Sequence, residues 1–114
     1  MDQLTIIEKK SGNPAVLQIT GEIDAKTAPE LKLQLELLIG NGSTNLILDF
    51  SNLTYISSAG IGVLSATLKF LKEKSGDLVL CNLSKEVKDT LDLMYFTKKV
   101  KVFTSVDGAL ANFK

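Results

Sequence analysis

The sequence contains no histidine and only one cysteine. Without histidine the chain lacks the commonest general base, the Ser-His and Cys-His nucleophile pairs, and most zinc-ligand sets. The single cysteine, Cys81, has no partner for a disulfide within the chain. These absences exclude much of enzyme chemistry, so we expect a binding protein without a catalytic residue, a metal or a cofactor.

The glycine-rich nucleotide motifs are absent as well. The chain has no G-x-x-x-x-G-K-[ST] phosphate loop, and no G-x-G-x-x-G motif follows an expected strand. Asp24 and Asp49 could meet in the folded chain, but the sequence supplies neither a pocket nor a partner base for them. A small enzyme or nucleotide-binding domain therefore gains no support from the motifs present.

Charge of one sign is not in excess, because 13 basic residues are balanced by 13 acidic residues. This balance argues against direct binding of nucleic acid, which depends on excess positive charge. No apolar run approaches the roughly 20 residues that cross a bilayer, and residues 1–8 lack the basic and apolar regions of a leader peptide. We expect a cytoplasmic protein with no membrane insertion.

The composition that remains suits one globular domain. The 114 residues are 45% hydrophobic and 23% charged, enough to bury a core without disulfides. We see no internal repeat, low-complexity tract or linker. A single domain is therefore expected over residues 1–114.

Hydrophobic periodicity predicts strands and helices that alternate after an initial hairpin. Strands are expected at residues 4–8, 15–20, 45–50, 78–81 and 100–103, with turns at 11–14 and 51–55. Helices are expected from Thr27 to Gly40, over residues 58–73, after Ser84, and from about Thr104. This order predicts an α/β fold with a mixed central sheet of four to five strands and about four helices.

Particular side chains are assigned to helix ends. Thr27 with Glu30, and Thr104 with Asp107, resemble capping boxes, and Ser84 is expected to cap the third helix.

Other side chains are assigned to buried or exposed faces. The residues expected to point inward are Leu31, Leu35 and Leu38 on the first helix, Val87, Leu91 and Met94 on the third, and Val106, Leu110 and Phe113 on the last. Leu33 and Leu37 fall on the opposite face of the first helix and are expected to be exposed. Cys81 ends an apolar strand, so we interpret it as a small buried hydrophobe rather than a reactive thiol.

The segment at residues 55–62, YISSAGIG, is unusually rich in small and hydroxyl residues. One interpretation is structural: Ser57 or Ser58 is an N-cap, and Ala59, Gly60 and Gly62 let the helix begin close to the sheet. The other is functional: a serine at a helix start is presented to a kinase on a rigid scaffold. A phosphoryl group there would meet free amides and the helix dipole, so it would act at an interface without unfolding the domain.

Two segments resemble the anti-sigma factor antagonists of the STAS group. They are Gly21-Glu22-Ile23-Asp24 and residues 53–64, LTYISSAGIGVL, and the similarity of layout covers nearly the whole chain. The resemblance implies a protein that binds an anti-sigma factor serine kinase and thereby frees a sigma factor. It also implies that the kinase phosphorylates Ser58, which releases the partner, and that a phosphatase restores the serine. The implied partner-binding residues, some of them in a loop beside the phosphorylated one, are Gly21, Asp24, Ser57, Ser58, Ala59, Gly60 and Ile61.

One position departs from the family pattern. The family usually has aspartate immediately before the phosphorylated serine, where this chain has Ser57. The absence of that acid could relax local charge repulsion, change recognition by the kinase or make Ser57 a competing phosphate acceptor, and the sequence does not choose among these. A second function also stays open: a STAS structural subunit of a transporter or signalling assembly that is never phosphorylated. Nothing in the sequence specifies the sigma factor or any self-association.

Overall fold

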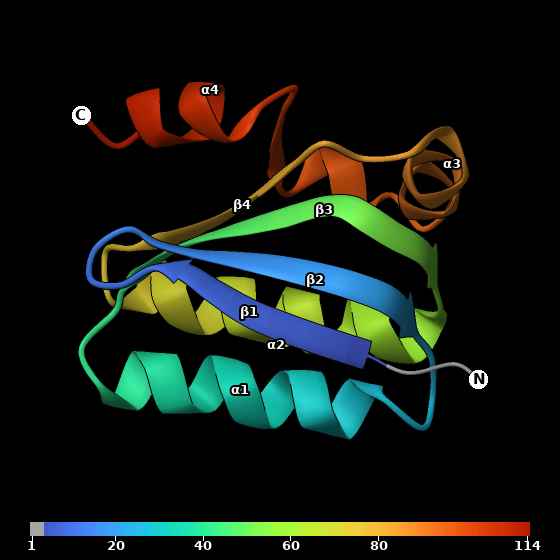
Figure 1. Ribbon diagram of the computed structural model, residues 1–114, viewed down its shortest axis with the longest axis horizontal. Coiled ribbons are helices and arrows are strands. Elements are labelled where there is room, and N and C mark those ends of the chain that lie inside the picture. Colours follow the sequence, from blue (N-terminus) through green and yellow to red (C-terminus); the bar gives the residue numbers. More distant parts are fainter. Residues whose placement is uncertain (1–3) are drawn as a thin grey trace.

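A five-stranded mixed sheet forms the centre of the fold (Figure 1). The computed structural model describes residues 4–114. The strands are β1 (Leu4–Lys10), β2 (Ala15–Ile23), β3 (Asn45–Ile56), β4 (Asp77–Cys81) and β5 (Lys101–Phe103), and they lie in the order of the chain. The β1 and β2 strands form an antiparallel hairpin, whereas β2 to β5 are parallel.

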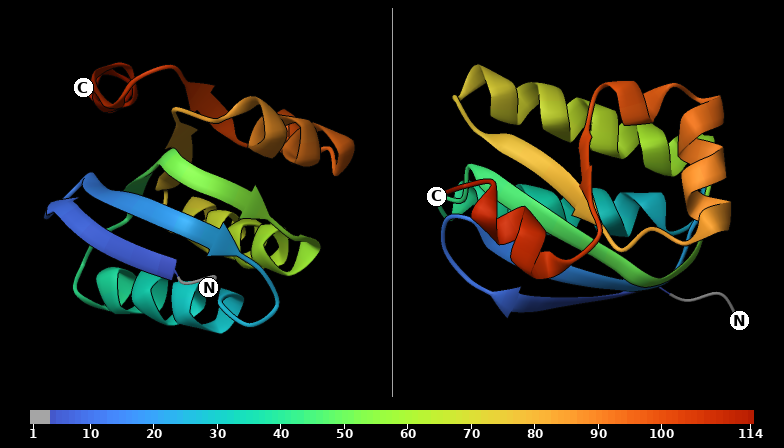
Figure 2. Two further views of the ribbon diagram at one scale, coloured as in Figure 1. Left: turned by 45° about the vertical axis from the view of Figure 1, so that its right-hand side comes forward. Right: turned by 90° about the horizontal axis from the view of Figure 1, so that it is seen from above.

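The helices are divided between the two faces and one end of this sheet. The α1 helix (Ala28–Gly40) and the α2 helix (Ser58–Glu73) cover one face, and α4 (Val106–Ala111) covers part of the other (Figures 1 and 2). The α3 helix (Lys85–Leu93) lies at the end where β3 finishes, and the short 3-10 helix η1 (Phe96–Lys98) follows it, in contact with α3 and β5. No helix within residues 4–114 has both the length and the apolar character that a bilayer span requires.

Alternation along the parallel strands builds two apolar clusters. In β3, Leu46, Leu48 and Phe50 belong to the larger cluster with α1 and α2, whereas Ile47 belongs to the smaller one beneath α4. Both faces of β3 are therefore buried, which explains its nearly continuous apolar sequence. The predicted α/β class, the mixed sheet and the four helices are confirmed.

The most important difference from the predicted elements concerns β3. Residues 51–55 were expected to form a turn, but they continue β3 as far as Ile56. The structure pairs Thr20 with Asn52 and Ile23 with Ile56, so the carboxyl-terminal half of β3 is held by β2. Gly21 likewise lies within β2 rather than in a loop, at φ +110° beside an irregularity of the β2–β3 register.

The two predicted capping boxes are wrong. Thr27 does stand before α1, but its hydroxyl accepts the N–H of Asp24 and donates to the carbonyl oxygen of Glu22 instead of capping the helix. At α4 the cap is Ser105, whose Oγ accepts the N–H of Gly108 at 2.9 Å, one residue later than expected. The predicted cap at Ser84 is confirmed, because its Oγ accepts the N–H of Val87 at 3.1 Å.

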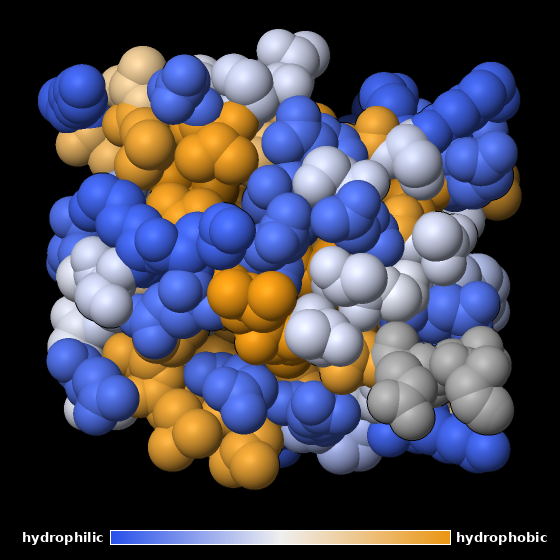
Figure 3. Space-filling view, viewed as in Figure 1, coloured by the Kyte–Doolittle hydropathy of each residue, from blue (hydrophilic) through white to orange (hydrophobic). Residues whose placement is uncertain are grey.

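Most predictions of burial are confirmed, with one correction. Leu33 and Leu37 are 55% and 53% exposed on the outer face of α1, where apolar side chains gather along the lower left of Figure 3. Cys81 is buried, and its burial raises the pKa of the thiol to about 12. Met94 was expected to face inward but is 48% exposed. It is the C-cap of α3, and the chain leaves the helical path at the next residue, Tyr95, which has a φ of +59°.

Candidate functional site

The segments that the sequence singled out meet at one edge of the sheet. The β2 and β3 strands end side by side at Ile23 and Ile56, and the N–H of Ser57 donates to the carbonyl oxygen of Ile23 at 2.8 Å. After β3 ends at Ile56, the chain begins α2 at Ser58. We call residues 21–24 and 57–61, which this pairing brings together, the Ser58 edge.

The two serines of this edge have different surroundings. Ser57 is half-buried and is the N-cap of α2, with its Oγ accepting the N–H of Gly60 at 3.4 Å. Ser58 is exposed and is the first residue of the helix. The structural interpretation is therefore confirmed for Ser57, and it leaves the hydroxyl of Ser58 accessible.

Gly60 allows α2 to begin close to the sheet. A Cβ atom at this position would lie 2.4 Å from Cγ2 of Ile23 and 3.0 Å from Cγ1 of Ile56. Both isoleucines are fully buried, so neither has room to move aside. The same role was predicted for Gly62, but that position is exposed and a Cβ there would meet nothing within 4 Å. The close approach therefore depends on Gly60 and not on Gly62.

Asp24 fixes the loop that borders Ser58. Its Oδ1 accepts the backbone N–H of Lys26 at 2.9 Å and that of Thr27 at 3.0 Å. These hydrogen bonds, that of Thr27 above all, hold the pKa of the Asp24 carboxyl below its ordinary value of 3.8. The carboxylate thus has a local structural role and also keeps a negative charge at the Ser58 edge.

An Asp24→Asn variant tests this charge by its dependence on pH. Because folding lowers the pKa of Asp24, the carboxylate stabilises the fold at pH values above its unfolded pKa. This contribution is lost as the pH falls through the lower folded pKa. We expect the variant to be less stable than the wild type at pH 7, with a difference that closes in acid. Urea unfolding of both proteins at pH 7 and across the acid range measures it, and a difference that grows in acid would contradict the assignment.

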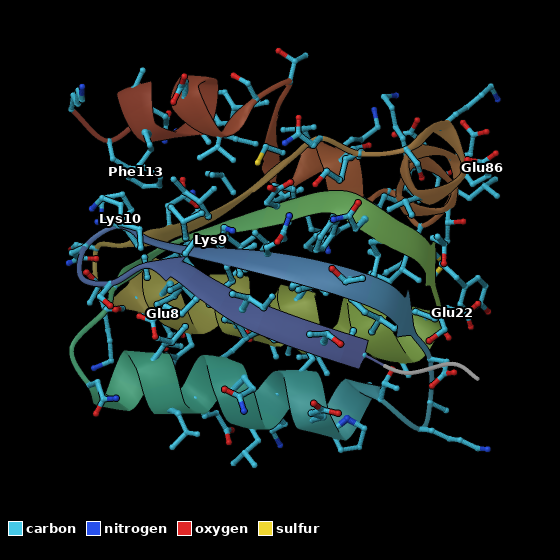
Figure 4. All side chains as sticks on the ribbon, in the orientation of Figure 1. Glu8, Lys9, Lys10, Glu22, Glu86 and Phe113 are labelled. Carbon is cyan, nitrogen blue, oxygen red and sulfur yellow. The ribbon has the colours of Figure 1, made fainter. Side chains whose placement is uncertain are left out.

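Glu22 of the Ser58 edge and Tyr55 beside it were not assigned a role from the sequence. Glu22 and Tyr55 are neighbours in the β2–β3 register, and Tyr55 is 48% exposed. Figure 4 shows Glu22 and Glu86 at this end of the molecule, whereas Lys9 and Lys10 lie at the opposite end. Tyr55 was expected to lie in a turn at residues 51–55. Its position beside Glu22 was not predicted, because it depends on the extension of β3 through these residues.

The second carboxylate considered from the sequence lies elsewhere. Asp49 pairs in register with Gln18, seven positions before Ile56, which corresponds to roughly 20 Å along a strand. Its Oδ1 accepts hydrogen bonds from Nδ2 of Asn82 and from the N–H of Ser51. Asp24 and Asp49 therefore do not form a pair. Among residues 4–114 no cluster of three or more potential metal ligands is present.

Comparisons with known proteins extend over almost the whole chain. The sequence model of the STAS domain matches residues 5–109. The protein BtrV of Bordetella bronchiseptica is 32% identical over 96 residues, which are 84% of this chain and 83% of that protein. The anti-sigma-B factor antagonist of Bacillus subtilis is 29% identical over 102 residues, covering 90% of this chain and 93% of its own.

The fold has a solved counterpart of similar extent. The crystal structure of an anti-sigma factor antagonist from Mycobacterium paratuberculosis has a TM-score of 0.87 at 23% identity. The two structures align over 97% of this chain and 94% of that one. The shared architecture therefore includes every element that forms the Ser58 edge.

Proposed function

Because the chain belongs to the STAS domain family, we propose that it is an anti-sigma factor antagonist whose binding surface is the Ser58 edge. It binds an anti-sigma factor that is itself a serine kinase, and so releases a sigma factor. Phosphorylation of Ser58 by this kinase ends the complex, and a phosphatase restores the free hydroxyl. The named relatives that resemble the chain over most of its length support this assignment.

The observation that carries the proposal is the accessibility of Ser58 on a rigid support. Ser58 is exposed at the first position of a 16-residue helix, and Gly60 and Ile61, two and three positions later, are buried. Kinases need an acceptor hydroxyl at the surface, and helix-anchored positions hold it in a defined orientation. The local structure therefore offers an acceptor without any rearrangement of the core.

The charge of a phosphoryl group on Ser58 explains why modification would weaken docking and yet leave the domain folded. Within the domain it would lie at the positive end of the α2 dipole, near the N–H groups of the first turn. Between two proteins the same group, with about −1.5 to −2 charges at neutral pH, must lose its water when the surfaces meet. It would also lie at an edge that already carries Glu22 and Asp24, against a single Lys26 in that loop. Modification thus weakens docking while it leaves the fold intact.

The hydrogen bond of Ser57 supports Ser58 as the acceptor. The Ser57 hydroxyl is half-buried and its Oγ accepts the N–H of Gly60, so modification there would disturb the start of α2. Serine and aspartate are both strong N-caps. Ser57 therefore keeps the capping role that an aspartate would have at this position.

Phosphorylation by a partner kinase is the direct test. The protein is mixed with each candidate anti-sigma kinase of its own genome and with ATP, and the product is mapped by tandem mass spectrometry. We expect one phosphate, on Ser58, and none on a Ser58→Ala variant. A Ser57→Ala variant, less stable by about 1 kcal/mol because its cap is lost, should still accept phosphate. No complex and no phosphate with any candidate would refute the proposal.

The structural-subunit function predicts different results. Ser57 in place of aspartate is the observation that favours it. In that case the protein would co-purify with a transporter subunit, and the charge at position 58 would have no effect on the association. Binding that is insensitive to Ser58→Asp would therefore favour this second function over the switch.

A further inference from the structure

Three consecutive large apolar side chains are exposed where α3 ends. Leu93 is 78% exposed, Met94 48% and Tyr95 67%. Leu93 and Tyr95 exceed every other exposed large hydrophobic residue described within residues 4–114. We call these three residues the α3 turn. Exposed apolar clusters of this kind mark interaction surfaces more often than isolated exposed leucines do.

Backbone hydrogen bonds to α3 and the buried side chain of the next residue hold the α3 turn in place. The N–H of Met94 donates to the carbonyl oxygen of Thr90 at 3.2 Å, and that of Tyr95 donates to the carbonyl oxygen of Asp92 at 3.0 Å. Tyr95 has a φ of +59°, a left-handed conformation that few bulky residues adopt. The next residue, Phe96, is only 2% exposed and anchors the chain in the core. The exposed side chains are thus carried by an ordered turn, which lowers the entropy cost of binding.

The α3 turn lies at the same end of the molecule as the Ser58 edge. In Figure 1 α3 is seen nearly end-on, above the end of β3 and the start of α2. The view from above in Figure 2 shows that the carboxyl end of α3 reaches the side on which α2 lies. The α3 helix also packs directly against β3, the strand that leads to Ser58. The two surfaces therefore lie at one end of the molecule, with the end of β3 between them.

The chemistry of the α3 turn is that of an interface anchor. Tyrosine and methionine are enriched in interface cores, and tyrosine is frequent among residues whose truncation costs most affinity. Asp89 and Asp92 border a hollow beside Leu93 and Tyr95. Both carboxylates are paired within α3 at 2.8 Å, with Lys85 and Lys88 respectively. The rim is therefore polar but nearly neutral, as in an interface with an apolar centre.

From this placement we propose that the α3 turn is a second, apolar contact for the same anti-sigma factor that binds at the Ser58 edge. The inference rests on the proposed function and adds a division of tasks to it. The α3 turn supplies affinity through burial of Leu93, Met94 and Tyr95, and it lies outside the site of modification. Ser58 supplies control, because only its surroundings change charge. The partner presents an apolar patch to α3 next to the surface that it presents to Ser58.

The test compares two matched double variants in binding to the anti-sigma kinase. Leu93→Gln with Tyr95→Asn removes the anchor, and asparagine tolerates the left-handed conformation at position 95. Leu33→Gln with Leu37→Gln removes two exposed apolar side chains from α1 instead. Isothermal titration of the unphosphorylated proteins should show an affinity loss of about 100-fold for the α3 variant and less than about threefold for the α1 variant. Circular dichroism melts of both variants identify any loss that is due to unfolding.

The possible outcomes separate this inference from the function on which it rests. If the wild type binds no anti-sigma factor, the proposed function fails and this inference fails with it. If the wild type binds and the α3 variant binds equally well, the function stands and this inference is overturned. Sedimentation of the wild type alone provides the last check. A dimer that only the α3 variant loses would assign the surface to a second copy of the chain and would also overturn the inference.

Discussion

A Ser58→Asp variant should bind its anti-sigma factor at least about 100-fold more weakly than the wild type and should melt within about 2 °C of it. The loss is expected because a buried charge without a partner at an interface costs several kcal/mol. Stability should be preserved because an acidic residue in the first turn of a helix interacts favourably with its dipole. Titration calorimetry and thermal melts of the same samples measure the two quantities together.

The Ser58→Asn variant is the matched control for this result. Asparagine has the shape of aspartate without its charge, so any loss of affinity that it shares with Ser58→Asp is due to side-chain size. We expect its affinity to lie within about tenfold of the wild type, because at most one partly exposed contact is altered. Equal losses for the two variants would show that charge is not what controls docking.

The element types could be predicted because each has a local cause. The apolar run of β3 and the 3.6-residue period of α2 are visible in the sequence, and α2 was predicted with its observed bounds. The length of β3 was not predictable, because residues 51–55 contain Ser51 and Asn52, which are frequent in turns. Pairing with β2 over residues 20–23 overrides that preference. The local sequence pattern therefore does not predict long-range strand pairing.

In the candidate site, too, features with a local cause could be predicted and features that depend on distant contacts could not. The run of small and hydroxyl residues before a helical period placed both Ser57 and Ser58 at a helix start, and only the resemblance to the STAS antagonists singled out Ser58. The capping boxes failed because Thr27 bonds to Asp24 and Glu22 in the bent loop, an alternative that a spacing pattern does not reveal. The α3 turn was missed because the helical period predicts Met94 on the buried face. In the structure Met94 is the C-cap of α3 and is exposed, and the chain leaves the helix directly after it.

The fit between α2 and the sheet makes Gly60 the most sensitive position of the site. In a Gly60→Ala variant the new methyl group would lie 2.4 Å from Cγ2 of the buried Ile23, so the start of α2 must move away from β2. Overpacking of this kind costs about 3 kcal/mol, which exceeds the roughly 1 kcal/mol that alanine gains over glycine in a helix. We therefore expect a net loss of about 2 kcal/mol in urea unfolding, together with weaker binding of the partner.

Gly62→Ala provides the control within the same helix turn. A Cβ atom at position 62 meets nothing within 4 Å, so the substitution should stabilise the protein by up to about 1 kcal/mol through helix propensity alone. Opposite signs for two Gly→Ala changes only two residues apart would show that close packing at Gly60 determines where α2 begins. Since Ser58 is the first residue of α2, the same packing sets where its hydroxyl is presented. A stabilised Gly60→Ala variant that binds normally would remove the physical basis for that positioning.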